Sequence, residues 1–343
     1  MILDALETIV HGKNLSRAEA DAAMEEILSG RAGDGEIASL LAALRQKGET
    51  IEELVGFATA MRRHAAPVFS SPRGAGQERL VDTCGTGGDG KGTFNISTCA
   101  ALVAAGAGAR VAKHGNRSIS SRAGSADVLE AMGVCITLSP LRMGEAVERL
   151  GIGFFFAPAV HAAMKHAMKA RQQLQGRTVF NLLGPLTNPA GARAQVAGVF
   201  AAGVVELVAR ALGELGVERA FVVHGADGLD EISISGETQV AEVREGAVRS
   251  YTVTPEDFGV SRSPIEEIAG GDPAANAEMI RWVLGGQRGA RRDVVLANAA
   301  AAMVAAGLAA DFACGARLAA ESIDSGAARR KLDELVAFCN QAG

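Results

Sequence analysis

The sequence predicts an α/β protein in which a small all-helical domain is hinged to a larger domain with a mostly parallel central sheet flanked by helices. Residues 1 to about 66 show helical periodicity alone. A stretch rich in Pro, Ser and Gly follows from Ala66 to Gly74 and reads as a linker. Beyond Arg79, short β-rich runs alternate with helical patterns, which is typical of a parallel sheet.

Two capping boxes mark helix starts in the N-terminal part of the chain. Ser16 is followed three residues later by Glu19, and Thr50 is followed three residues later by Glu53. We expect Asp34 to cap a third helix, because leucines and isoleucine recur at helical spacing after it. These signals predict a helical domain over residues 1–70.

The larger domain is expected to contain six strands that alternate with helices, followed by a different pattern. The expected strands are Leu80–Asp82, Ala109–Lys113, Val134–Leu138, Gly153–Phe156, Gln195–Phe200 and Ala220–His224. From Glu231 to Thr254 the pattern indicates a small antiparallel excursion, and from Pro273 to Cys339 it is helical. Ligands in open α/β sheets sit at the carboxyl ends of strands, so the loops after the expected strands should converge on one site.

Composition restricts the class of protein. Hydrophobic residues make up 48% of the chain and charged residues 21%, so a packed core is expected. The net charge of −5 gives no general attraction to nucleic acid or to an anionic membrane. The five cysteines show no metal-binding spacing, and the N-terminus lacks the pattern of a signal peptide. We therefore expect a soluble, cytoplasmic protein with reduced thiols.

The segment from Val81 to Gly92 is rich in glycine and lies between a short apolar run and an alanine-rich helix. Glycines at this density allow several backbone N–H groups to approach one ligand, and a helix start adds free N–H donors. This arrangement predicts a phosphate or pyrophosphate site. It has neither the Walker A spacing nor the dinucleotide fingerprint. The alternative is a glycine-rich surface turn without a ligand.

Cationic and hydroxyl side chains follow the next expected strand. Lys113 and Arg117 could neutralise phosphate oxygens, and the alternative is a solvated basic turn. Ser118, Ser120, Ser121 and Ser125 continue this segment. Ser125 could cap a helix or donate its hydroxyl to a phosphate.

Carboxylates gather after the last parallel strand. Asp227, Asp230 and Glu231 lie within five residues, and beside a diphosphate such a group suits Mg²⁺. The alternative is an acidic turn. His161 and Arg171 are ten residues apart and share one face of an expected helix, although a surface position would explain them equally well.

Taken together, these segments resemble the anthranilate phosphoribosyltransferase family over nearly the whole chain. The motifs that carry the resemblance are DTCGTGGDG (Asp82–Gly90), FNIST (Phe94–Thr98), KHGNRSISSRAGSADVLEAMG (Lys113–Gly133), His161 with Arg171, RTVFNLLGPLTNPA (Arg177–Ala190) and DGLDEIS (Asp227–Ser233). They occur in the family's order. Arg122 stands where the family commonly has lysine, and this position is not expected to touch a ligand.

The resemblance implies transfer of a phosphoribosyl group from phosphoribosyl pyrophosphate to anthranilate in tryptophan biosynthesis, with Mg²⁺ at two ions per protomer. It implies a homodimer formed through the small domains. It also implies that a segment near 165–190 returns to the small domain, which leaves 75–164 and 191–343 for the α/β domain.

The resemblance also implies site residues, with no catalytic residue assigned. The residues expected to bind phosphoribosyl pyrophosphate are Gly85, Thr86, Gly88, Asp89, Asn95, Ser97, Thr98, Lys113 and Ser125. Those expected to bind anthranilate are Gly85, His114, Asn116, His161 and Arg171. The expected metal ligands are Ser97, Asp230 and Glu231.

Two other functions stay open on the sequence. A pyrimidine nucleoside phosphorylase of similar fold also uses a glycine loop and a Lys-His segment, but it binds free phosphate. A non-catalytic, nucleic-acid-binding relative on the same scaffold should carry a basic stripe, which the acidic net charge disfavours.

Overall fold

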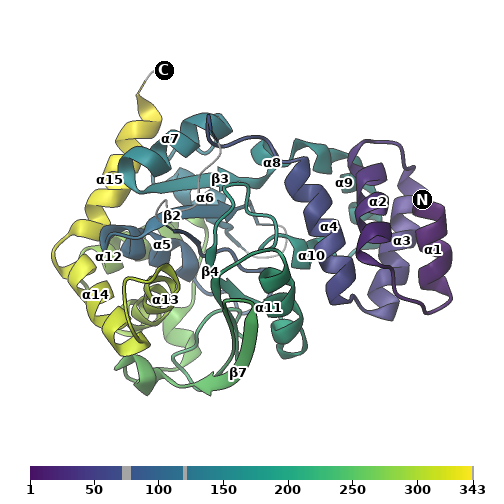
Figure 1. The fold of residues 1–343 in the computed structure, drawn as a ribbon. Coiled ribbons are helices and arrows are strands. Elements are labelled where there is room, and N and C mark those ends of the chain that lie inside the picture. The colour runs from purple at the N-terminus through teal and green to yellow at the C-terminus, as the bar shows by residue number, and fades with distance from the viewer. Residues whose placement is uncertain (72–78, 119–121, 342–343) are drawn as a thin grey trace.

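The computed structural model describes residues 1–71, 79–118 and 122–341, and it has two parts (Figure 1). A bundle of helices holds the N-terminus, and a larger α/β part holds the C-terminus. The helices of the bundle are α1 (Ile2–Val10), α2 (Arg17–Leu28), α3 (Asp34–Lys47), α4 (Ile51–Arg63) and α9 (Lys165–Leu174). The expected linker begins in the described residues and continues into 72–78, which lie outside them.

Side-chain caps explain where the bundle helices begin. The hydroxyl oxygens of Ser16 and Thr50 accept hydrogen bonds from backbone N–H groups three residues on, as the two capping boxes predict. The prediction that Asp34 caps α3 is wrong by one residue. Gly33 is the cap residue, and the Glu36 carboxylate accepts its N–H at 2.7 Å. The capping side chain therefore belongs to the first turn of the helix and not to the residue before it.

The larger part is built on one seven-stranded sheet with the order β3-β2-β1-β4-β5-β6-β7. The strands are β1 (Leu80–Asp82), β2 (Arg110–Gly115), β3 (Ile152–Phe156), β4 (Ala194–Gly198), β5 (Arg219–Gly225), β6 (Thr238–Arg244) and β7 (Ala247–Val253). β1 to β5 pair in parallel, and β6 and β7 add an antiparallel edge. The fold class predicted from the sequence is confirmed.

The strand expected over Val134–Leu138 is wrong. These residues form turns between α6 (Ser125–Ala131) and α7 (Pro140–Leu150). Val134 and Ile136 are buried while their neighbours are more exposed, so burial alternates along the segment as it does in a strand. The segment pairs with no strand of the described sheet, and it serves instead to pack two side chains under the helices.

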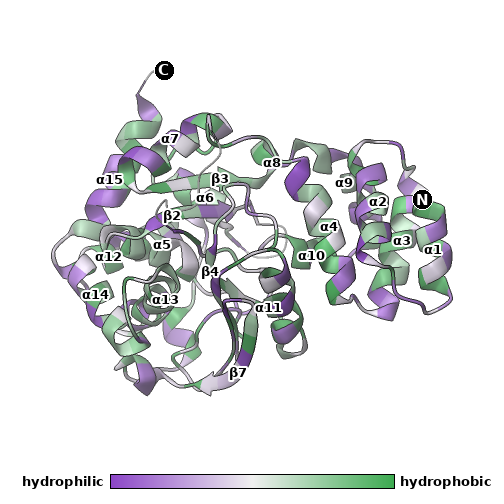
Figure 2. Ribbon diagram, in the orientation of Figure 1, coloured by the Kyte–Doolittle hydropathy of each residue, from purple (hydrophilic) through white to green (hydrophobic). Residues whose placement is uncertain are grey.

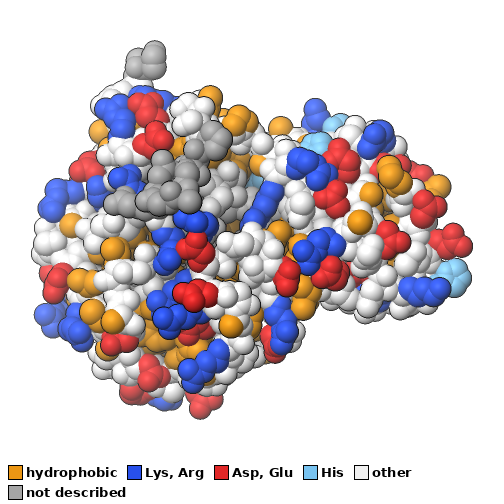
Figure 3. All heavy atoms as spheres, viewed as in Figure 1, with side chains coloured by type: hydrophobic (Ala, Val, Ile, Leu, Met, Phe, Trp, Pro, Cys, Tyr) orange, Lys and Arg blue, Asp and Glu red, His pale blue; other side chains and the backbone are white. Residues whose placement is uncertain are grey.

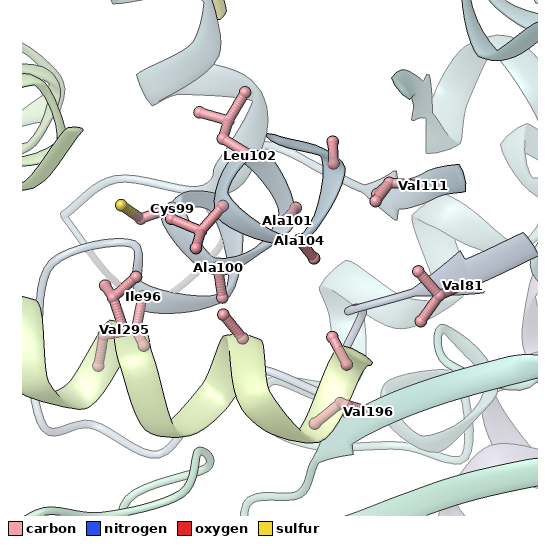
Figure 4. Close-up of a cluster of buried hydrophobic side chains, with 14 of the residues drawn as sticks. Val81, Ile96, Cys99, Ala100, Ala101, Leu102, Ala104, Val111, Val196 and Val295 are labelled. Carbon is pink, nitrogen blue, oxygen red and sulfur yellow. The ribbon is translucent and has the colours of Figure 1, made fainter. Parts of the chain in front are cut away.

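One hydrophobic core fills the space between the sheet and the C-terminal helices (Figure 4). Val81, Val111 and Val196 project from three neighbouring strands toward α5 (Ile96–Gly106) and α13 (Ala290–Ala306). Alanine dominates both helices, so they pack closely, and α13 is hydrophobic where it crosses the centre of this part (Figure 2). The outer helices are α12 (Pro273–Leu284), α14 (Phe312–Asp324) and α15 (Ala327–Asn340).

A second core joins the opposite face of the sheet to the helical bundle. Along β5, Phe221 and Val223 belong to the first core, whereas Ala220 and Val222 belong to the second. The helix α11 (Val205–Glu214) covers this face and packs against α4 of the bundle. The bundle and the sheet therefore share buried side chains.

Besides the linker that follows α4, two further chain crossings connect the bundle with the larger part. Short elements lie along these crossings, namely α8 (Ala157–Val160), α10 (Phe180–Leu183) and the 3-10 helix η1 (Ala162–Met164). Between them α9 packs against α3 and α2. The other 3-10 helices are η2 (Ala202–Val204), η3 (Pro255–Phe258) and η4 (Ile265–Ile268). Across the described ranges, none of the helices has the length and apolar character needed to cross a membrane.

Candidate active site

The glycine loop connects β1 to α5 at the carboxyl edge of the sheet, as the sequence predicts. Gly87, Gly88, Gly90 and Gly92 all have φ between +64° and +82°, a region that side chains with a Cβ rarely adopt. The loop can therefore curl back on itself and present backbone N–H groups at the start of α5. This geometry suits an anionic ligand.

The base of the loop is packed directly against β4. A Cβ on Gly85 would lie 2.4 Å from the carbonyl oxygen of Gly198, so only glycine allows this approach. The Thr86 N–H donates to the same carbonyl at 2.8 Å, and the Thr86 hydroxyl accepts the N–H of Phe200 at 3.0 Å. The loop is thus anchored at its start and free of such packing at Gly87 and Gly90.

Lys113 lies in the second half of β2, and its side chain reaches the start of the glycine loop. Its ammonium is buried and donates to the carbonyl and the hydroxyl of Thr83 at 3.1 and 3.0 Å. Thr98 is also buried, and its hydroxyl has no partner. It lines a cavity of about 10 Å³ together with Lys113. Thr98 is thus a core residue with a free hydroxyl beside the Lys113 side chain.

Three partly buried carboxylates meet below the glycine loop, and we call Asp89, Asp230 and Glu231 the carboxylate cluster. The Asp89 carboxylate accepts the N–H of Asp230 at 3.3 Å, and the Glu231 carboxylate accepts the N–H of Ser97 at 3.2 Å. Burial and the charges of Asp89 and Glu231 raise the pKa of Asp230 well above its usual range. Burial also raises the pKa of Glu231 to about 7, although Lys113 opposes this.

The chemistry of the carboxylate cluster fits Mg²⁺. Carboxylates that raise one another's pKa lack a compensating cation, and the Lys113 ammonium compensates only part of their charge. In the part of the chain that the structure describes, no three His, Cys, Asp or Glu side chains are already arranged as a metal cage. Mg²⁺ commonly binds through one or two carboxylates plus waters and substrate phosphates, so an incomplete protein cage is what it requires.

His114 and His161 lie side by side with ring centroids 5.2 Å apart in an edge-to-face arrangement. His114 Nδ1 donates to the carbonyl of Gly184 at 3.1 Å, and His161 Nε2 donates to the carbonyl of Thr187 at 3.0 Å. Burial lowers the pKa of His114 to about 3 and that of His161 to about 4. Both rings are therefore neutral at pH 7, and the buried Nε2 of His114 has no partner.

Arg171 lies in α9, and its guanidinium carbon is 5.0 Å from the ring centroid of Phe180. Burial lowers its pKa, and none of the described residues forms an ion pair or hydrogen bond with its guanidinium. The expectation that His161 and Arg171 share one helix is wrong, because His161 lies at the junction of α8 and η1. We call His114, His161 and Arg171 the His/Arg set.

The other expected site residues make contacts within the protein. The Asn95 side chain donates to the carbonyl of Ala123 and accepts from Asn276, both at 3.0 Å. The Ser125 hydroxyl donates to the carbonyl of Asn116 at 3.3 Å, and Gly124 rather than Ser125 caps α6.

Arg117, a candidate phosphate ligand in the sequence, forms ion pairs with Asp127 and Glu130. Its guanidinium is therefore already compensated by two carboxylates. Ser120 and Ser121 lie outside the described residues.

Buried polar residues that sequence reasoning missed connect the carboxylate cluster's side of the site with the His/Arg set. The Asp82 carboxylate accepts the N–H groups of Cys84 and His114 and the side-chain N–H of Asn188, at 3.0, 3.1 and 2.7 Å. Gln195 donates to the carbonyls of Cys84 and Pro185 at 3.2 and 2.8 Å. The sequence feature that could have indicated this network is Gln195, a polar residue within an otherwise apolar strand.

Arg177 was also missed, since the helix and turn that contain it suggested no chemistry. Its guanidinium donates to the carbonyl of Gly88 and lies 4.2 Å from the ring centroid of Phe200. It therefore holds the tip of the glycine loop to the segment that crosses from the bundle.

Comparison with known families covers both parts of the chain. The model of the glycosyl transferase family, a/b domain, matches residues 77–329, and that of the glycosyl transferase family, helical bundle domain, matches residues 3–65. Two curated relatives are the anthranilate phosphoribosyltransferase of Solibacter usitatus, 55% identical with 98% of each chain covered, and that of Syntrophobacter fumaroxidans, 53% identical with 99% of this chain and 100% of the relative covered.

Solved structures show the same similarity. The anthranilate phosphoribosyltransferase from Thermus thermophilus is 46% identical and superposes with a TM-score of 0.91, covering 98% of this chain and 99% of that one. The enzyme from Saccharomyces cerevisiae in complex with PRPP and Mg is 27% identical, with a TM-score of 0.89 over 99% of this chain and 98% of that one.

Proposed function

The chain belongs to the anthranilate phosphoribosyltransferase family, and from this premise we propose how its residues share the reaction. The enzyme transfers the phosphoribosyl group of phosphoribosyl pyrophosphate (PRPP) to anthranilate, with release of pyrophosphate, as a step of tryptophan biosynthesis. It uses Mg²⁺. The observation that carries our assignment is the half-buried Arg171 guanidinium, which has an aromatic neighbour and no carboxylate partner among the described residues.

Anthranilate, an aromatic amine with a carboxylate, suits the His/Arg set. We assign its carboxylate to Arg171, because a charge-assisted pair compensates a half-buried guanidinium. The unpartnered Nε2 of neutral His114 is an acceptor for an N–H of the amine. Gly85, Asn116 and His161 complete the anthranilate side of the proposal.

PRPP suits the glycine loop and the carboxylate cluster. We assign its diphosphate to the backbone of Gly85, Thr86 and Gly88, with Lys113 as the nearest buried cation. Asp230, Glu231 and Ser97 would hold Mg²⁺, at two ions per protomer. The further PRPP residues of the proposal are Asp89, Asn95, Thr98 and Ser125.

The reaction forms a bond between the amine nitrogen and ribose C1 while the bond from C1 to the pyrophosphate oxygen breaks, and the amine loses a proton. The amine of anthranilate is neutral at pH 7, so its lone pair is available without a strong base. Catalysis then comes mainly from the positioning of two substrates and from stabilisation of the departing diphosphate. Mg²⁺ supplies compensation for the charge that develops on that diphosphate.

The test is the loss of anthranilate fluorescence on mixing the purified protein with PRPP and Mg²⁺, with EDTA as the control. Loss that depends on Mg²⁺ supports donor, acceptor and metal together. If folded protein with fresh PRPP gives no loss, the proposal is wrong, and nucleoside cleavage with phosphate and nucleic-acid binding at two salt concentrations are tested next. The relatives support the transferase over both, and charges of both signs are interspersed on the visible face (Figure 3).

We also propose that the enzyme is a cytoplasmic homodimer that associates through its helical bundles. Leu3 and Val10 lie seven residues apart on α1, so they share a face, and their exposed fractions are 56% and 67%. Five free cysteines suit a reducing compartment. Light scattering after size-exclusion chromatography tests the dimer, and the variant Leu3→Glu with Val10→Glu should be monomeric. A monomeric wild-type protein would contradict the proposal.

A further inference from the structure

Asn298 makes an unusual set of contacts with the backbone that carries the two acidic residues of the site. It is 2% exposed and lies in the middle of α13. Its side-chain oxygen accepts the N–H of Ile232 at 3.0 Å, and its side-chain N–H group donates to the carbonyl of Ile232, also at 3.0 Å. One asparagine thus pairs with both backbone groups of the residue directly after Glu231, as a neighbouring β-strand would.

The Asn298 side chain is itself fixed. Its N–H group also donates to the carbonyl of Val294, one turn earlier in α13, at 2.9 Å. The helix α13 is buried along most of its length and packs against α5, α14 and β4. The position of Ile232 is therefore tied to a deeply buried helix of the α/β part.

The other side of the same segment meets β4 without any free space. A Cβ on Gly198 would lie 1.5 Å from the carbonyl oxygen of Asp230. The side chains of Leu229 and Ile232, which flank the acidic pair, are 0% and 1% exposed. Asp230 and Glu231 are thus held between β4 and α13, with an apolar anchor before and after them.

The contacts of this segment with β4 and α13 act against electrostatic repulsion between carboxylates. Asp230 and Glu231 are partly buried beside Asp89, and like charges at short distance repel each other. Movement of the segment away from the glycine loop would therefore lower the electrostatic energy. The two hydrogen bonds between Asn298 and the Ile232 backbone oppose that movement without involving the carboxylates. Groups that orient metal ligands in this way commonly contribute strongly to metal affinity.

We propose that Asn298 is a positioning residue for the metal site: it holds Asp230 and Glu231 where Mg²⁺ and the diphosphate meet them. This inference rests on the proposed function of the two carboxylates. Asn298 is a positioning residue rather than a catalytic one, since its side-chain hydrogen bonds within the described residues go to the backbone of Ile232 and Val294.

The experiment compares wild type, Asn298→Ala and the control Ser322→Ala. Ser322 is also buried in the helices around α13, and its hydroxyl donates to the backbone carbonyl of Val103 at 2.8 Å, away from the site. Mn²⁺ alone is titrated into each protein and free Mn²⁺ is measured by electron paramagnetic resonance. The Mg²⁺ dependence of the rate and the KM for anthranilate are measured in parallel.

Asn298→Ala should bind Mn²⁺ at least about tenfold more weakly and require correspondingly more Mg²⁺ for half-maximal rate. Its KM for anthranilate should change less than twofold, whereas a general loss of structure would change every constant. Ser322→Ala should lower the melting temperature and leave metal binding unchanged. Wild-type Mn²⁺ affinity in a folded Asn298→Ala protein would overturn the proposal.

Asn298→Asp is the second variant, because it keeps the shape and the acceptor oxygen for the Ile232 N–H. It should shift metal affinity in the same direction. If neither variant folds while Ser322→Ala does, Asn298 serves the whole fold and the assignment is wrong. If wild type itself neither binds Mn²⁺ nor turns over, the proposed function of the carboxylates fails, which is a separate result.

Discussion

We assign the carboxylate cluster to the PRPP side and the His/Arg set to the anthranilate side of one site, and the charged groups of the two sides are opposite in sign. Burial raises the pKa of Asp230 and of Glu231, and the Lys113 ammonium offsets only part of this at Glu231. Arg171 is a half-buried cation without an anion among the described residues, and burial keeps the two imidazoles of the His/Arg set neutral. Each side is incomplete in a way that a ligand of opposite charge corrects, which indicates that ligands were part of what shaped this site.

The largest effect is expected at Asp230. Asp230→Asn should reduce the rate at limiting Mg²⁺ by at least about 100-fold, because the metal loses a charged ligand. The melting temperature of the ligand-free protein should not fall, because the change removes one of several repelling charges. Both are measured on the same preparation. The control is Asp293→Asn, which changes a half-buried carboxylate on α13, outside the carboxylate cluster. Turnover equal to wild type at limiting Mg²⁺ would remove Asp230 from the metal site.

A smaller and selective effect is expected at Arg171. Arg171→Ala should raise the KM for anthranilate roughly 10- to 100-fold, since a charge-assisted pair with the substrate is lost. The Mg²⁺ requirement should stay as in wild type. Arg171→Lys should recover only part of the affinity, because an ammonium lacks the planar fork of a guanidinium. If Arg171→Ala shifted the Mg²⁺ requirement as much as the KM, the two sides of the site would not be separable.

The smallest effect concerns acid stability. Burial lowers the pKa of His161 to about 4 from its usual 6.5, so the unfolded chain binds a proton that the folded protein does not. The contribution of neutral His161 to the free energy of unfolding is therefore fully present above pH 6.5 and is lost as the pH falls toward 4. Between about pH 7 and about pH 4.5, the free energy of unfolding of His161→Asn should fall by about 1–2 kcal/mol less than that of wild type. Urea unfolding at the two pH values measures these free energies. An equal fall in the variant and in wild type would count against a neutral, buried His161.

The two sides also differ in how far the sequence revealed them. The glycine loop and the Asp230–Glu231 pair are local motifs, and each follows its strand directly, so spacing and residue type were enough to suggest them. The His/Arg set is assembled from β2, the α8–η1 junction and α9. His114 and His161 are in ring contact, but no local pattern joins the three segments, and only the family resemblance assigned their residues to one ligand.

The fold shows the same division between local and long-range information. Capping boxes and strand alternation predicted most helices and strands, and the antiparallel edge followed from short alternating runs. The alternation at Val134–Leu138 predicted a strand because burial under helices can imitate the period of a strand. Contacts such as those of Asp82 with Asn188, or Asn298 with Ile232, join residues far apart in the chain, and local sequence does not say which partners meet.

The most direct test of the opposition between the two sides is the melting temperature with and without Mg²⁺ alone, from about pH 5.5 to about pH 7.5. The pKa of Glu231 is raised from 4.5 to about 7, so the folded, metal-free protein holds protons that the unfolded chain releases. These carboxylates therefore destabilise the metal-free protein progressively as the pH rises from 4.5 toward 7.

Mg²⁺ binds the ionised form, so its stabilising effect should grow with pH in wild type and be largely lost in Asp230→Asn. A stabilisation by Mg²⁺ that is independent of pH, or equal in the two proteins, would contradict a carboxylate cluster built to receive a cation.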